Sequence, residues 1–155
     1  PAPPAATPAE SPPAQTQTAT NPDAAALGAA ISSGQWIFRG DAGYVSTCYG
    51  APESECAIAV QCEQPTGKIT VLYSAEVVPD QATTLRIITA SQNLDLAARS
   101  FNEGLPSVNA ELASDDARLA ALAASQERFG VDVRGEINVF PWDESIARVI
   151  AACGS

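Results

Sequence analysis

Three pairs of neighbouring carboxylates are the side chains of this sequence best suited to hydrolytic chemistry: Glu53/Glu55, Asp115/Asp116 and Asp143/Glu144. A glycosidase holds two carboxyl groups about 5–10 Å apart across its substrate. Adjacent residues do not specify that separation, whereas acidic residues in a first helical turn stabilise the helix through its dipole. We therefore interpret Asp115, Asp116, Asp143 and Glu144 as helix-start residues, which makes glycan hydrolysis the least favoured function.

Other catalytic groups are absent from the sequence. It contains no His, which excludes Ser–His and Cys–His catalysis and His-ligated zinc sites. It also has no Gly-x-Ser-x-Gly, Ser-x-x-Lys, glycine-rich phosphate loop or Asp-rich calcium loop. We expect no catalytic residue, no metal site and no cofactor, and hence no enzymatic activity.

Four cysteines, Cys48, Cys56, Cys62 and Cys153, predict two disulfides and an exported protein, because disulfides persist in oxidising compartments. Their spacing does not match the Cys-x-x-Cys patterns of zinc sites. Three pairings are open. We favour Cys48 with Cys56, which can face each other across a short loop. We favour Cys62 with Cys153, which fall on a predicted central strand and on the apolar face of the last predicted helix.

Trp36 and Trp142 are the candidate ligand contacts, because tryptophan combines a large apolar ring with a polar N–H group. Both residues also suit the core. Trp36 opens a predicted strand beside Ile37 and Phe38, and Trp142 precedes a helix that must pack on the sheet. Core packing is the simpler interpretation of both.

The chain is strongly acidic. It has 18 acidic and 8 basic side chains, a formal charge of -10 and a pI near 4.2. The basic residues form no cluster, so we expect neither a nucleic acid nor an anionic membrane surface as a partner. The same charge favours a cationic partner, because it would speed the approach of positively charged molecules.

Residues 1–34 are rich in Pro, Ala and Thr. Such a segment has too little apolar surface to form a core and favours extended conformations. We expect a disordered tether over residues 1–34 and a single β-rich globular domain over residues 35–155. The sequence contains no Met, so we interpret it as the processed form of a secreted protein or lipoprotein, whose membrane contact is limited to an N-terminal anchor that has been removed.

After the tether, short runs of alternating apolar and polar residues separated by turn residues predict an antiparallel β domain. The expected strands are 35–39, 44–48, 56–62, 68–74, 84–89, 93–97, 108–112, 128–133 and 136–140. The last two form a hairpin around Arg134-Gly135. We expect Val131, Val133, Ile137 and Val139 to lie on its core face.

Two helices are expected near the end of the chain. Ser114 is the predicted N-cap of a short one. The second begins near Pro141 and carries an apolar stripe as far as Cys153. The sequence thus predicts a mainly β (α+β) fold, an antiparallel sandwich or barrel of about eight or nine short strands with one short helix and a C-terminal helix, braced by disulfides.

Five segments occur in a distinctive order along the domain: Gln35-Trp36, Ala57–Cys62, Ser114–Leu119, Arg128–Val133 and Pro141–Glu144, the last followed by Arg148–Ile150 and Cys153. This order resembles a family of small uncharacterised secreted proteins and lipoproteins of alphaproteobacteria, over about residues 35–153. The resemblance implies a bond between Cys62 and Cys153. It brings no known activity, and so it informs compartment and fold only.

The leading hypothesis is a non-enzymatic binding module of the bacterial cell envelope, periplasmic, outer-membrane-associated or secreted, with a protein or glycan partner. A first alternative is a proteinaceous inhibitor of a basic hydrolase such as lysozyme, because the net charge of about -8 on the domain, with 16 acidic and 8 basic residues from Gln35 onward, would steer a cationic enzyme toward it. A carboxylate-dependent glycan hydrolase is the second alternative.

Overall fold

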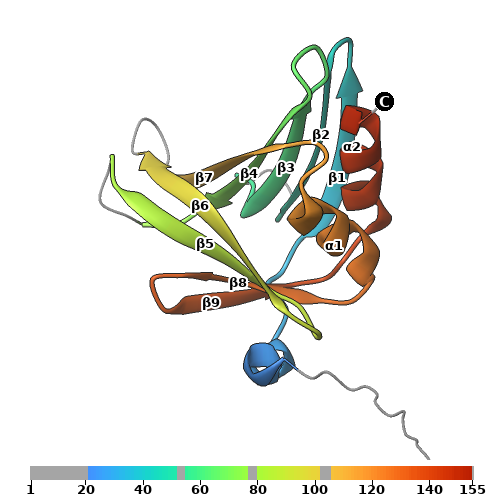
Figure 1. Cartoon of the computed structure of the whole chain (residues 1–155). Coiled ribbons are helices and arrows are strands. Elements are labelled where there is room, and N and C mark those ends of the chain that lie inside the picture. The colour runs from blue at the N-terminus through green and yellow to red at the C-terminus, as the bar shows by residue number, and fades with distance from the viewer. Residues whose placement is uncertain (1–20, 52–54, 77–79, 102–105, 155) are drawn as a thin grey trace, which may run out of the picture.

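The computed structural model describes residues 21–51, 55–76, 80–101 and 106–154 (Figure 1). Nine strands form one sheet in the order β1-β2-β3-β4-β7-β6-β5-β8-β9, and every neighbouring pair is antiparallel. The predicted mainly β fold is therefore confirmed. The strands are β1 (Gln35–Asp41), β2 (Tyr44–Gly50), β3 (Ile58–Glu63), β4 (Lys68–Ser74), β5 (Ala82–Ile88), β6 (Asn93–Phe101), β7 (Ser107–Ala113), β8 (Phe129–Val133) and β9 (Glu136–Phe140).

The sheet bends into two halves that face each other. β6 pairs with β7 only through Arg99–Phe101, and the rest of β6 diverges from β7. Helix α1 (Ala117–Ser125) lies at this opening (Figure 1). Its Arg118 donates from Nη1 to the carbonyl oxygen of Asp95 at 2.7 Å, which satisfies a backbone acceptor of β6. One half thus contains β1–β4 and β7, and the other contains β5, β6, β8 and β9.

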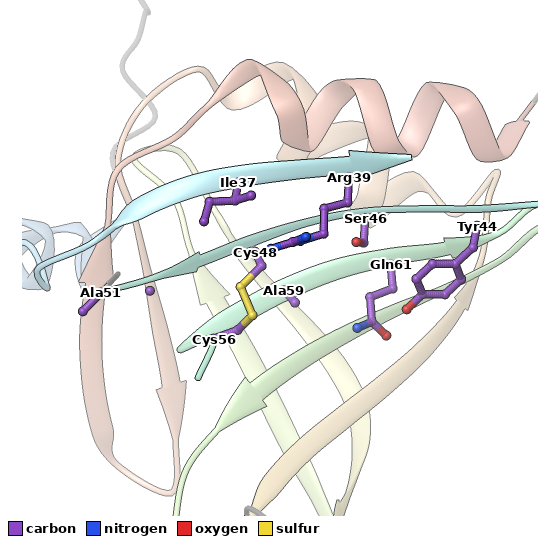
Figure 2. Close-up of a pocket in the computed structure, with 10 residues that line it drawn as sticks. Ile37, Arg39, Tyr44, Ser46, Cys48, Ala51, Cys56, Ala59 and Gln61 are labelled. Carbon is purple, nitrogen blue, oxygen red and sulfur yellow. A yellow bond between two sulfur atoms is a disulfide. The ribbon is translucent and has the colours of Figure 1, made fainter. Parts of the chain in front are cut away.

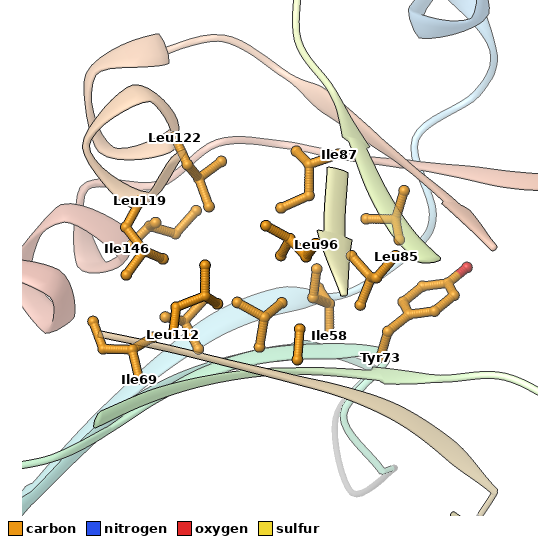
Figure 3. Packing of buried hydrophobic residues seen from close by; sticks show 14 of the residues in the cluster. Ile58, Ile69, Tyr73, Leu85, Ile87, Leu96, Leu112, Leu119, Leu122 and Ile146 are labelled. Carbon is orange, nitrogen blue, oxygen red and sulfur yellow. The ribbon is translucent and has the colours of Figure 1, made fainter. Parts of the chain in front are cut away.

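The core lies between the two halves and beneath the helices (Figure 3). Helix α2 (Glu144–Gly154) buries Ile146, Val149, Ile150 and Cys153 at the predicted helical spacing. It packs on the inner side of β1–β4, where Ser145 and Thr47 share a buried hydrogen bond of 2.7 Å. The C-terminal helix therefore defines which side of these strands is the inner one.

Both helices are capped by aspartates. The carboxylate of Asp116 accepts from the Arg118 N–H at 2.8 Å, so Asp116 and not Ser114 is the N-cap of α1. The predicted cap was wrong because Ser114 lies in the turn directly after β7, where its N–H donates to the Gly67 carbonyl oxygen and α1 begins only after Asp116. Asp143 accepts from the Ser145 N–H at 2.9 Å at the start of α2.

The last hairpin corrects a second prediction. β8 and β9 pair Val133 with Glu136, so Val131 lies opposite Asn138 and Asp132 lies opposite Ile137. Residues that lie opposite each other share a face. Val131 and Val133 are buried as expected, but Ile137 lies on the other face and is 40% exposed. The two-residue turn shifts the alternation by one position, so Val139 also lies on the face opposite to Val131, although it is buried there at 1% exposure.

Residues 21–34 pack on the domain, although we expected them to belong to the tether. The 3-10 helix η2 (Pro22–Gly28) contacts β5, β8 and β9 and buries Leu27. Asn21 is buried and donates to the Thr89 carbonyl oxygen at 3.0 Å and to Asn93 Oδ1 at 2.6 Å. The folded part of the chain therefore includes Asn21, and the rest of the expected tether, residues 1–20, lies outside the described residues.

Both predicted disulfides are confirmed. Cys62 and Cys153 are buried and join β3 to α2 across a sequence separation of 91. Cys48 and Cys56 join β2 to the start of the next segment across a separation of 8, and both are half-buried. One disulfide therefore belongs to the core and the other to the surface.

Candidate functional site

The outer side of β1–β4 and β7 is the surface turned away from α2. Along β2, Val45, Thr47 and Tyr49 are buried on the inner side, so Ser46 and Cys48 point outward. The same alternation holds along the neighbouring strands. We call this surface the outer face, and its residues are Ile37, Arg39, Asp41, Tyr44, Ser46, Cys48, Ala59, Gln61, Glu63, Lys68, Thr70, Leu72, Ser74, Ser107, Asn109 and Glu111.

Three adjoining hollows lie on or beside the outer face, and all three are lined by Cys56. The first has a volume of about 350 Å³ and is lined among others by Arg39, Tyr44 and Gln61; we call it the Arg39 hollow (Figure 2). The second has about 290 Å³, and the third about 350 Å³. Small-molecule sites usually occupy about 300–1,000 Å³, so the Arg39 hollow is large enough for a small ligand.

Apolar side chains are also exposed here. Among the described residues, five large apolar side chains are exposed, and two of them, Ile37 at 37% and Tyr44 at 39%, lie on the outer face. A third, Phe101 at 38%, lies opposite Ser107 at its border. Exposed apolar groups gathered on one face are typical of an interaction surface.

Most of the basic side chains are held by contacts within the protein. Six of the eight have an acidic, carbonyl or aromatic partner: Lys68 with Glu111, Arg86 with Asp95, Arg99 with the Asp80 carbonyl, Arg118 with Asp116, Arg128 with the Leu27 carbonyl and Arg148 with the Phe38 ring. Within the described part of the chain, Arg39 and Arg134 have no hydrogen-bond, ion-pair or ring partner. Arg39 lines a hollow and Arg134 lies in the β8–β9 turn.

Tyr44 contributes a hydroxyl group at one end of the Arg39 hollow. Burial raises the pKa of Tyr44, and the carboxylate of Glu63, its neighbour on β3, raises that pKa further. The phenol is therefore protonated at neutral pH and remains able to donate a hydrogen bond.

The two predicted ligand contacts lie elsewhere. The indole of Trp36 packs against the core, with its ring 5.2 Å from that of Tyr49, and donates to the Pro141 carbonyl oxygen at 2.8 Å. The indole of Trp142 donates to the Leu122 carbonyl oxygen at 3.0 Å and joins the segment just before α2 to α1. The structure does not bring these two side chains to the outer face, and ligand contact by either stays a prediction.

The predicted carboxylate pairs are divided among different roles. Asp116 pairs with Arg118 at 2.7 Å, and the hydrogen bonds from Arg118 hold the pKa of Asp116 below its usual range. Asp143 caps α2, Glu144 lies in its first turn, and Asp115 is exposed. Glu53 lies outside the described residues.

Glu55 borders two of the hollows, and Glu76 lines one of them with it. Sequence reasoning missed this surface. The available signal was Ile37 and Tyr44, two large side chains on the otherwise polar side of alternating strands.

No model of a known protein family, no curated protein and no solved structure matches the chain. Within the described residues, no three His, Cys, Asp or Glu side chains lie close enough together to hold a metal ion. Of the helices in these residues, none has the length and apolar character needed to cross a membrane. The two disulfides indicate that the protein folds in an oxidising environment.

Proposed function

We propose that the protein is a non-enzymatic binding module of the bacterial cell envelope that presents its outer face to a protein or glycan partner. The observation that carries this proposal is the gathering of three hollows and of exposed apolar side chains on the outer face and its border. Inner-side residues of the same strands are buried beneath α2, so the outer face is the side left for a partner.

The chemistry of the outer face supports binding better than catalysis. The Arg39 hollow offers a guanidinium, a phenol, a hydroxyl and an amide, which are hydrogen-bonding groups and include no general base suited to neutral pH. Glu55 and Glu76 are exposed to solvent. The Pro-rich composition of residues 1–20 suits a tether that lets the domain reach its partner.

The experiment is a comparison of two charged variants of the full chain as bait in bacterial envelope extract. Ser46→Arg places a large side chain at the centre of the outer face, and Thr84→Arg makes a similar change at an exposed position of β5. We expect a defined partner to bind the parent and Thr84→Arg but not Ser46→Arg. A partner that binds Ser46→Arg as well as the parent would contradict the proposal.

A second candidate is inhibition of a basic hydrolase such as lysozyme. It is favoured by the charge of -10 and by the two carboxylates, Glu55 and Glu76, that line one hollow. Inhibition should then weaken as salt rises, because screening shortens the range of electrostatic attraction. It should also weaken in a Glu55→Gln/Glu76→Gln variant but not when Glu127 and Glu144 are changed to Gln. Absence of inhibition at low salt would exclude this function.

A further inference from the structure

The Arg39 hollow has a polar end and an apolar side. Arg39 and Ser46 lie opposite each other on β1 and β2, and Gln61 lies opposite Ser46 on β3. Figure 2 shows the Arg39 side chain extending from β1 toward Cys48, with Ser46, Gln61 and Tyr44 further along the same surface. Ile37 and Ala59 lie on either side of Cys48, two residues along the strands from Arg39, Ser46 and Gln61. Together with the Cys48–Cys56 disulfide they form the apolar side of the hollow.

The polar end is rich in donors that the protein itself leaves unused. The side chains of Arg39, Tyr44, Ser46 and Gln61 all line the hollow, and within the described residues none of them forms a hydrogen bond with another protein group. Arginine has five N–H donors and no acceptor, and it binds carboxylates through paired hydrogen bonds. A ligand group that pairs with the Arg39 guanidinium must therefore accept hydrogen bonds.

The charges around the hollow select a single negative charge. Arg39 is the only charged side chain among the described residues that line it. The next row of the face carries two carboxylates, Asp41 and Glu63, on either side of Tyr44. These repel any anion, and they repel a doubly charged group such as hydrogen phosphate more strongly than a carboxylate, which carries the one charge that Arg39 neutralises.

We propose that the Arg39 hollow binds a carboxylate attached to a small apolar group, as found at the end of a peptide or in a short free acid. The carboxylate accepts from Arg39, Ser46 and Gln61, and the apolar group lies against Ile37, Ala59 and the Cys48–Cys56 disulfide. This inference rests on the outer face being the binding surface, and it names the chemistry that the face recognises.

The test is a titration of the 15N-labelled full chain, followed by amide chemical shifts at pH 7 and constant ionic strength. The probes are N-acetyl-alanine, its uncharged amide N-acetyl-alaninamide, propionate and inorganic phosphate. We expect N-acetyl-alanine to shift the amides of Ile37, Ser46 and Gln61, and the uncharged amide to bind at least tenfold more weakly. Equal binding by these two probes, or tighter binding of phosphate, would overturn the inference.

Two arginine variants provide the matched control. Arg39→Gln and Arg134→Gln remove the same charge from the two arginines that lack a partner within the described residues. We expect Arg39→Gln to weaken N-acetyl-alanine binding at least tenfold and Arg134→Gln to leave it within twofold. Equal losses in both variants would mean that only net charge matters and would refute the site.

The remaining outcomes distinguish a peptide end from a free acid as the ligand. They also distinguish failure of the carboxylate site from failure of the proposed function. Propionate binding as tightly as N-acetyl-alanine supports the site with free acids as ligands, and weaker propionate binding supports it with peptide ends. If no probe shifts the hollow while Ser46→Arg still abolishes partner binding, this inference is wrong and the proposed function stands.

Discussion

The indole N–H of Trp36 donates to the carbonyl oxygen of Pro141 at 2.8 Å, and this bond joins the first strand to the segment that enters the last helix. β1 and β9 are the two edge strands of the sheet. Ile31, just before β1, also forms a bridge with Val139 of β9. Side-chain and bridge contacts near the ends of the chain therefore hold the two edges together.

Replacing Trp36 by Phe tests whether its hydrogen bond helps to hold the two edges of the sheet together. The ring is retained in part, but the half-buried Pro141 carbonyl loses its donor, which should lower the free energy of unfolding by about 1–3 kcal/mol. Urea denaturation measures the change. The neighbouring Gln35 is exposed, so Gln35→Ala should stay within about 0.5 kcal/mol of the parent. Equal stabilities of Trp36→Phe and the parent would show that the bond contributes nothing.

The two disulfides should differ in their contribution to stability. In the chain-entropy account, closing the longer loop restricts the unfolded chain more. We expect Cys62→Ala/Cys153→Ala to lose about 4–5 kcal/mol and Cys48→Ala/Cys56→Ala about 2–3 kcal/mol, since their sequence separations are 91 and 8. Guanidinium denaturation of both double variants gives the comparison. The reverse order of stability would contradict it.

Asp116 predicts an acid-dependent loss of stability. Its pKa is lowered in the folded protein, chiefly by hydrogen bonds from Arg118, so the unfolded chain takes up the proton first as pH falls. The stabilisation is therefore complete above the unfolded pKa of about 3.9 and is lost below it.

An Asn at position 116 keeps the helix-capping oxygen but has no charge. Asp116→Asn should be less stable than the parent at pH 7, by up to about 1 kcal/mol for this partly exposed pair. The difference should vanish near pH 2, as urea denaturation at both pH values can test. Asp115→Asn, at an exposed neighbour, serves as the control. A difference for Asp116→Asn that does not change with pH would be inconsistent with the ion pair.

Asn21 should hold residues 21–34 on the domain. Asn21→Ala removes its bonds to Thr89 and Asn93 and leaves a buried carbonyl without its donor, at a cost of about 1–3 kcal/mol. We expect faster hydrogen exchange and faster proteolysis over residues 22–34, with the rest of the domain unchanged. Ser33→Ala, at an exposed position of the same segment, should have no effect. Unchanged exchange in Asn21→Ala would show that the segment is held by other contacts.

The sequence predicted the elements well because their signals are local. Alternation and turn residues placed all nine strands, with the bounds of Lys68–Ser74 and Glu136–Phe140 matched. The apolar stripe placed α2 and its cysteine correctly. Ser114 was misassigned as a cap because its partner, Gly67, lies on a distant connection.

Features that depend on distant partners were not predictable. Asn21 is buried by residues about 70 positions later in the chain, and composition alone does not reveal that contact. Ile137 was placed on the wrong face because the two-residue turn decides which positions lie opposite each other. The outer face became visible only when the burial of each strand showed which side α2 covers.

The most direct test of the binding surface is site-specific photo-crosslinking in the bacterial envelope. A photoreactive phenylalanine analogue is introduced into the full chain either at Ser46 on the outer face or at Thr84, an exposed position of β5. The account predicts a discrete crosslinked product from position 46 and none from position 84. A product from position 84 alone, or no product from either position, would contradict the assignment of the outer face as the binding surface.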